Sequence, residues 1–192
     1  MSTNTHQNPE LNVVIGPMYS GKSTELLRIY NRYKRNYKIL VINHNSDIRY
    51  GENSVNTHNK NSVSSKSVSE LYDSNITENI DNYNIILIDE GQFFKNLYKF
   101  CKDIVENKNK IVYVFGLSGD SNRQKFGEIL DLIPIADNVT LLKSICNKCK
   151  IAKDAQFTLR ITKNTEQVSV GGNNEYMAVC RNCWLESSKN II

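Results

Sequence analysis

One octapeptide decides the fold: Gly16-Pro17-Met18-Tyr19-Ser20-Gly21-Lys22-Ser23. It matches the pattern G-x-x-x-x-G-K-[ST], a glycine-rich loop that wraps the phosphates of a nucleoside triphosphate. In such a loop Gly21 lets the backbone approach the phosphates, Lys22 reaches the β and γ oxygens, and Ser23 binds Mg²⁺. The alternative interpretation is an accidental glycine loop between a strand and a helix. We predict a P-loop whose residues surround the phosphates of ATP, with Mg²⁺ beside them.

The flanking sequence supplies the strand and the helix that a P-loop requires. An apolar run from Leu11 to Ile15 precedes the loop, and a helical pattern from Thr24 to Tyr33 follows it. Three more β-rich runs, each bounded by polar residues, lie at 38–42, 85–88 and 111–115. Their long separations favour parallel strands joined by crossover connections. We therefore expect an α/β protein built on a P-loop (RecA-like) parallel sheet.

The remaining segments are less regular. The polar stretch 43–84 contains one expected short helix, near Ser67 to Tyr72, and otherwise loops. A further helix is expected at 96–105, where Cys101 suits the core better than a ligand or nucleophile role. We expect four regions: a flexible N-terminus (1–10), a P-loop α/β domain (11–142), a small lobe that contains two cysteine pairs (143–185) and a flexible tail (186–192).

The charge pattern and the termini exclude several classes of partner. The 192 residues include 24 Lys and Arg against 20 Asp and Glu, a net charge of +4, with no long block of one sign. The start of the chain lacks the apolar core of a signal peptide, and no stretch approaches the roughly 18 apolar residues of a membrane span. We expect no nucleic-acid partner, no membrane partner and a cytoplasmic location, which is the host cytoplasm if the source is viral.

Two acidic residues follow the third apolar run. Asp89 comes directly after 85–88, where a P-loop protein places a second acidic partner for Mg²⁺. Glu90 follows at once, and a carboxylate beside the metal can accept the proton of an attacking hydroxyl or water. The alternative for Glu90 is a solvated acid at the start of a loop. We predict that Glu90 is the general base.

Four of the five cysteines form two closely spaced pairs. Cys146 and Cys149 make one CxxC, and Cys180 and Cys183 make the other. Four thiolates from two such turns can surround Zn²⁺ tetrahedrally and leave no open position, so the metal would be structural. A thioredoxin-like redox pair is the alternative, which we disfavour because there are two pairs and neither is expected to open a helix after a strand.

Taken together, these motifs resemble the thymidine kinase family of the small, zinc-containing cellular and poxviral type, rather than the herpesvirus type. The resemblance extends from about Leu11 to Trp184. It rests on four segments in the order that the family has them: Gly16 to Leu26, Asp47-Ile48-Arg49-Tyr50, Asp89-Glu90-Gly91-Gln92-Phe93-Phe94, and Val170-Gly171-Gly172 through Tyr176 to Cys180-Arg181-Asn182-Cys183.

The resemblance implies a reaction and a set of partners. The reaction is transfer of the γ-phosphoryl group of ATP to the 5′-hydroxyl of thymidine, with Glu90 as the base, giving dTMP for DNA precursor salvage. Asp47 and Asp89 would hold Mg²⁺ largely through water, and Arg49 would add positive charge near the phosphates. Members of the family are usually homotetramers that dTTP, the end product, inhibits.

The resemblance also implies a nucleoside pocket. The loop between the cysteine pairs resembles the family's lasso, which closes over the nucleoside and reads the base through backbone groups. Enclosing the 5-methyl group in apolar walls gives only about 1 to 3 kcal/mol of selectivity, so deoxyuridine is expected to be a weaker substrate. Several of these residue types also fill ordinary cores. The expected pocket residues are Met18, Phe93, Leu117, Ser121, Phe126, Thr158, Val168, Ser169, Val170, Gly171 and Tyr176.

One segment departs from the family pattern. Residues 117–126 have Ser118 where the family has Asp, Ser121 where it has an aromatic residue, and Gln124-Lys125 where it has Lys-Pro. The change at Ser121 bears on the shape of the pocket, whereas the P-loop and Glu90 are unaffected.

Two other functions fit parts of the sequence. A P-loop followed by an acidic pair also occurs in motors that move nucleic acid, although this chain lacks room for a second motor domain. A non-enzymatic zinc module would contact phosphates through the basic residues near the metal, which are Lys148, Lys150, Lys153 and Arg181.

Overall fold

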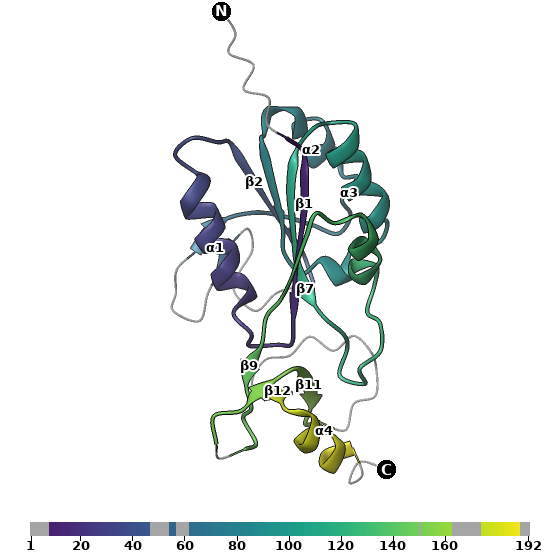
Figure 1. The fold of residues 1–192 in the computed structure, drawn as a ribbon. Helices are drawn as coiled ribbons and strands as arrows, with labels where there is room; N and C mark the ends of the chain where they lie inside the picture. The colour runs from purple at the N-terminus through teal and green to yellow at the C-terminus, as the bar shows by residue number, and fades with distance from the viewer. Residues whose placement is uncertain (1–7, 47–53, 57–61, 150, 163–173, 189–192) are drawn as a thin grey trace, which may run out of the picture.

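A six-stranded parallel sheet forms the centre of the computed structural model, which describes residues 8–46, 54–56, 62–149, 151–162 and 174–188 (Figure 1). The strand order is β5-β2-β6-β7-β1-β8, and every pairing in this sheet is parallel. The parallel α/β fold expected from the sequence is therefore confirmed. The strands are β1 (Glu10–Gly16), β2 (Ile39–His44), β5 (Lys66–Val68), β6 (Ile85–Ile88), β7 (Ile111–Leu117) and β8 (Asn138–Leu141).

Helices cover both faces of the sheet, which explains why its inner strands are largely apolar. In β6, Ile86 and Ile88 belong to the core on the α3 side, whereas Ile85 and Leu87 belong to the core on the α1 side. Figure 1 shows these two helices on opposite sides of the sheet. The elements that cover it are α1 (Lys22–Tyr33) on one face and α2 (Ser74–Thr77), η1 (Ile80–Asn82), α3 (Leu97–Glu106) and η3 (Ile129–Ile135) on the other.

The four strands and two of the helices predicted from the sequence are present. Cys101 lies in α3, fully buried in the core, as expected. The helix predicted near Ser67 to Tyr72 is wrong. Lys66–Val68 instead forms β5, in which Val68 pairs with His44 of β2. Pairing with the neighbouring strand and burial of Val68 override the weak local helical pattern.

A small lobe follows β8 and lies beyond the carboxyl ends of the parallel strands (Figure 1). It contains two antiparallel pairs, β9 (Ser144–Ile145) with β10 (Asp154–Ala155) and β11 (Phe157–Arg160) with β12 (Tyr176–Val179), and ends in α4 (Arg181–Ser188). Its core is separate from the sheet's cores and consists of Cys146, Ala155, Leu159, Ala178, Val179, Cys180 and Cys183.

Two short strands, β3 (Ser54–Asn56) and β4 (Ser62–Ser64), form an antiparallel pair, and Val55 and Val63 from them bury against the α1 side of the sheet. In the part of the chain that the structure describes, no helix combines the length and apolar character needed to cross a membrane. Residues 1–7 and 189–192, which belong to the ends expected to be flexible, lie outside the described residues.

Candidate active site

The predicted P-loop joins the end of β1 to the start of α1. Gly21 caps α1 with φ of +86°, a left-handed conformation that glycine adopts at little cost. Lys22 is buried, and its Nζ donates to the carbonyl oxygens of Pro17 at 2.8 Å and Gly16 at 3.3 Å. The ammonium group therefore lies inside the curve of the loop, next to the positive end of the α1 dipole. Ser23 follows in the first turn of α1. This arrangement suits an anion.

The lobe contacts the P-loop directly. The backbone N–H of Met18 donates to Thr158 Oγ1 at 3.0 Å, a contact between residues 140 positions apart. Tyr19, whose φ is +63°, packs against the apolar core of the lobe. Two predicted pocket residues, Met18 and Thr158, are thus brought together at the boundary between the sheet and the lobe.

The acidic pair lies at the carboxyl end of β6. Asp89 is buried at 4% exposure, and its Oδ1 accepts a hydrogen bond from the backbone N–H of Glu90 at 3.0 Å. Glu90 is half-buried and has φ of +52°, an uncommon conformation for a residue with a side chain. Its Oε2 accepts a hydrogen bond of 2.5 Å from Gln92 Nε2. Both carboxylates are therefore held in place by their own segment, which continues into η2 (Gly91–Phe93).

Aromatic rings from three segments gather beside this pair. Phe93 meets Phe126 edge to face with ring centroids 5.3 Å apart. On its other side Phe93 lies 5.5 Å from the ring of His44, and His44 also meets Phe94 at 4.8 Å. Burial lowers the pKa of His44, so the imidazole is neutral at pH 7. The predicted pocket residues Phe93 and Phe126 are in contact, beside the predicted base.

The segment that departs from the family pattern is held by the lobe. Trp184 Nε1 donates to the backbone oxygen of Ser121 at 3.1 Å. The Arg123 guanidinium carbon lies 3.7 Å from the centroid of the Trp184 ring and 5.6 Å from that of Phe157. Asp120 shapes the turn, because its Oδ1 accepts from the backbone N–H of Asn122 and of Gln124. The position of Ser121 therefore depends on contacts with α4 of the lobe.

We expect Arg123→Ala to loosen this contact. Losing the stacked guanidinium should lower the free energy of unfolding by about 1 kcal/mol, and it should expose the Trp184 ring to water. Trp184 is the single tryptophan of the chain, so its fluorescence maximum should move to longer wavelength. The matched control is Lys125→Ala. It also removes a positive charge from this segment, but Lys125 pairs with Asp131 of η3, which lies outside the lobe. Unchanged emission in Arg123→Ala would show that the stacking does not hold the segment.

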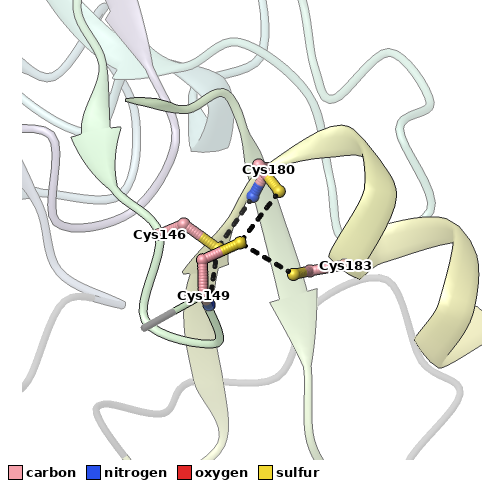
Figure 2. Close-up of side chains that lie close together, drawn as sticks. All are labelled: Cys146, Cys149, Cys180 and Cys183. Carbon is pink, nitrogen blue, oxygen red and sulfur yellow. Dashed lines mark hydrogen bonds between the residues drawn. The ribbon is translucent and has the colours of Figure 1, made fainter. Parts of the chain in front are cut away.

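Four thiols meet within the lobe (Figure 2). The Sγ atoms of Cys146, Cys149, Cys180 and Cys183 all lie within 4.8 Å of one another. The distances from Cys149 Sγ are 3.6 Å to Cys180 Sγ and 3.3 Å to Cys183 Sγ. A tetrahedron of Zn–S bonds of about 2.3 Å separates its sulfurs by about 3.8 Å. The cluster can therefore hold a metal ion.

Backbone donors favour the thiolate form that a metal requires. Burial acts to raise the pKa of Cys146, but the backbone N–H groups of Cys149, Cys180 and Lys148 outweigh it and lower that pKa to about 6. Hydrogen bonding to Cys149 raises the pKa of Cys183 to about 12. The second CxxC does open a helix after a strand, contrary to the sequence expectation, since Cys180 lies between β12 and α4. Convergence of all four sulfurs nevertheless favours a metal over two redox pairs.

The two remaining predicted pocket residues that the structure describes, Tyr176 and Leu117, each have a hydrogen-bond partner. Tyr176 is buried in β12, where its hydroxyl accepts hydrogen bonds from the guanidinium of Arg160. Leu117 ends β7, and its N–H donates to Gln92 Oε1 at 3.0 Å. The remaining predicted residues lie outside the described part of the chain, and they are Asp47, Arg49, Val168, Ser169, Val170 and Gly171.

Sequence reasoning assigned no role to five residues that the structure places in or around the site. Gln92 lies in the segment Asp89 to Phe94, which carries part of the family resemblance, and that position was the only sign of its role. Neither His44 nor Arg160 is part of any motif, and the contact between Arg123 and Trp184 joins segments that have no sequence relation. A buried polar side chain cannot be recognised in a sequence when its partners are far along the chain.

A phosphate loop after the first strand of a parallel sheet, with acidic residues after a nearby strand, defines the class of P-loop α/β proteins. Within that class, a sequence model of the thymidine kinase family matches residues 9–184. The thymidine kinase of Sheeppox virus (strain KS-1) is 46% identical over 175 residues, covering 91% of this chain and 96% of the viral protein. Those of Myxoma virus (strain Uriarra) and Vaccinia virus (strain Western Reserve) are 42% and 41% identical, covering 91% and 92% of this chain and 96% and 97% of theirs.

The chain belongs to the thymidine kinase family. It is therefore a kinase, an enzyme that transfers a phosphoryl group.

Proposed function

We propose that this kinase transfers the γ-phosphoryl group of ATP to the 5′-hydroxyl of thymidine, with deoxyuridine as a weaker substrate, and so supplies dTMP for DNA precursor salvage. The observation that carries the proposal is the alignment of three features at one end of the sheet. These are the P-loop with its inward Lys22, the acidic pair Asp89 and Glu90, and the aromatic pair Phe93 and Phe126.

The proposed roles follow from the chemistry of each group. The thymidine O5′ attacks the γ-phosphorus, the bond from that phosphorus to the β-bridging oxygen breaks, and ADP leaves. Glu90 accepts the proton of the 5′-hydroxyl. Lys22 and the backbone N–H groups of the P-loop offset the charge on the phosphates, assisted by Arg49.

Magnesium suits the chemistry of the residues that we assign to it. The Ser23 hydroxyl and the carboxylates of Asp47 and Asp89 are oxygen donors, which Mg²⁺ prefers, and it commonly keeps several of its waters. When bound with ATP, the ion supplies charge neutralisation at the β and γ oxygens. We assign Ser23 as the direct ligand and the two aspartates as partners through water.

We assign the nucleoside to residues of the P-loop, of η2, of the segment around Phe126 and of the lobe. Phe93 and Phe126 offer apolar ring surface, and Met18 and Thr158 meet at the boundary with the lobe. We further assign backbone groups of residues 168–171 to the base. Because Ser121 is held through its backbone oxygen by Trp184, we propose that the lobe sets the pocket shape at this position.

We propose Zn²⁺ as the metal of the four cysteines and a structural role for it. Four sulfur ligands leave no position for substrate. The metal would join the turn after β9 to the start of α4 and thereby close residues 150–179 into one loop. On this basis we divide the chain into a P-loop domain (11–142) and a zinc lobe (143–185).

We also propose that the enzyme is a homotetramer inhibited by dTTP. An exposed edge supports self-association, because β8 is the last strand of the sheet among the described residues and exposes Val139 at 45% and Leu141 at 55%. Unpaired apolar edges tend to be covered by another chain. Sedimentation velocity measures the assembly, and initial rates at increasing dTTP measure the inhibition.

The test of the function is a coupled assay of ADP formation with thymidine, deoxyuridine, deoxycytidine or no nucleoside. We expect the highest kcat/KM with thymidine and a value about 10- to 100-fold lower with deoxyuridine, as loss of one methyl contact allows. ATP hydrolysis that needs no nucleoside and rises with DNA would instead identify a motor. The alternative of a non-enzymatic zinc module that binds nucleic acid has little support, because two of its proposed phosphate contacts are used within the lobe. Lys148 donates to Ser187 Oγ at 2.7 Å, and Arg181 stacks on Phe157.

A further inference from the structure

Gln92 occupies the position between the predicted base and the central sheet. Its side chain is almost fully buried at 2% exposure. Gln92 Nε2 donates to Glu90 Oε2 at 2.5 Å, and Gln92 Oε1 accepts from the backbone N–H of Leu117 at 3.0 Å. Only one orientation of the amide satisfies both contacts, because the reversed amide would set oxygen against oxygen and nitrogen against nitrogen. The end of β7 therefore determines which atom faces Glu90.

Two glycines pack closely against Gln92. A Cβ on Gly116 would lie 2.4 Å from Gln92 Oε1 and 2.6 Å from Ile129 Cδ1. A Cβ on Gly127, whose φ is +59°, would lie 2.1 Å from the backbone oxygen of Gln92. These distances are shorter than any van der Waals contact, so both positions require glycine while Gln92 stays in place. Gly116 thus allows close approach of the Gln92 amide, and Gly127 allows close approach of the Gln92 backbone.

The contact has a consequence for the position of the carboxylate. The same contact limits rotation of a side chain whose backbone already has φ of +52°. Orientation matters to rate, because a displacement of about 1 Å at a reacting group can cost about 10²-fold.

We propose that Gln92 is a positioning residue that keeps the Glu90 carboxylate aimed at the nucleoside hydroxyl. The inference rests on the proposed function of Glu90 as the general base. Gln92 itself touches neither substrate nor metal in this assignment, and it acts through Glu90. Its role differs from that of a buried amide that only joins backbone segments, because one of its two partners is the predicted base.

Gln92→Glu tests the inference most directly. The substituted side chain keeps the shape and still accepts from Leu117 N–H, but it replaces the donor facing Glu90 with a second carboxylate oxygen. Two carboxylates at such a distance cannot both ionise readily. We expect the acid limb of the kcat profile to move to higher pH by at least about one unit. Gln92→Met, which has similar volume and no amide, should lower kcat by up to about 10²-fold with little change in KM for ATP.

The control is Ile104→Ala, a core substitution on α3 that should lower stability without moving the pH profile. If Gln92→Glu and Gln92→Met keep the parental profile and lose activity only as their folded fraction falls, Gln92 is structural and the inference is overturned. Should Gln92→Met fail to fold, the profile of Gln92→Glu decides alone. Glu90→Gln distinguishes failure of the inference from failure of the proposed function. If Glu90→Gln is inactive and the Gln92 variants keep the parental pH profile, only the positioning role is rejected. If Glu90→Gln is active, the role of Glu90 as the base is rejected as well.

Discussion

Replacing Glu90 with glutamine should lower kcat by about 10²- to 10⁴-fold, the range typical of losing a general base. Glutamine has nearly the same size, so the fold and the binding of ATP should be retained. The substituted amide can turn its oxygen toward Gln92 Nε2 and keep that hydrogen bond. What it cannot do is accept the proton of the 5′-hydroxyl, so the loss should appear in kcat rather than in KM for ATP.

Initial rates with thymidine, thermal unfolding and calorimetric binding of an ATP analogue together check this result. Glu106→Gln is the matched control, since Glu106 is an exposed residue at the end of α3. Near-parental turnover in Glu90→Gln would show that another group takes the proton. A large drop accompanied by loss of ATP binding would point to misfolding at the carboxyl end of β6 instead.

Cys146→Ser should remove the metal and release the lobe. Binding free energies of structural zinc reach about 10 to 16 kcal/mol in small domains, so losing one thiolate ligand affects folding of the lobe as a whole. Cys146 also accepts two backbone hydrogen bonds, from Cys149 and Cys180, which a serine oxygen meets with different geometry. The sheet should remain folded, because its two cores are separate from that of the lobe.

The measurements are elemental analysis for zinc and the emission of Trp184. Trp184 comes directly after Cys183 in α4 and donates to Ser121, so its environment reports whether the lobe is docked. Turnover should fall with the fluorescence change, because Thr158 and the segment around Ser121 lose their position. Cys101→Ala is the control, as Cys101 is buried in the sheet core and should leave the zinc content unchanged. Parental zinc content in Cys146→Ser would contradict the ligand set.

The prediction of the fold from sequence succeeded where a local pattern was sufficient. The apolar runs that became β1, β2, β6 and β7 are buried on both faces, so each stands out by composition. The prediction missed β5 and β8, the two edge strands of the six-stranded sheet. β5 is three residues long and buries only Val68. All four residues of β8 are exposed, so its two apolar residues do not form the continuous run of a buried strand. Pairing with a neighbouring strand defines both of them.

The candidate site divides in the same way. The P-loop, the acidic pair and the two CxxC pairs were visible because each is formed by residues within a few positions of one another. The contacts that arrange them join distant residues: Gln92 to Leu117, Met18 to Thr158, and Ser121 to Trp184. Nothing in the composition of these residues marks them as partners.

The sequence by itself therefore determined the class of chemistry: a phosphate loop, an acidic pair after a buried strand, and four thiols with metal-ligand spacing. Only the tertiary structure decided how these parts face one another, including the hydrogen bond from Gln92 to Glu90 and the docking of the lobe on the P-loop. The physical reason is that backbone conformation and side-chain chemistry are local properties, whereas a buried hydrogen bond between remote residues forms only once the packed sheet has brought them within 3 Å or so of each other.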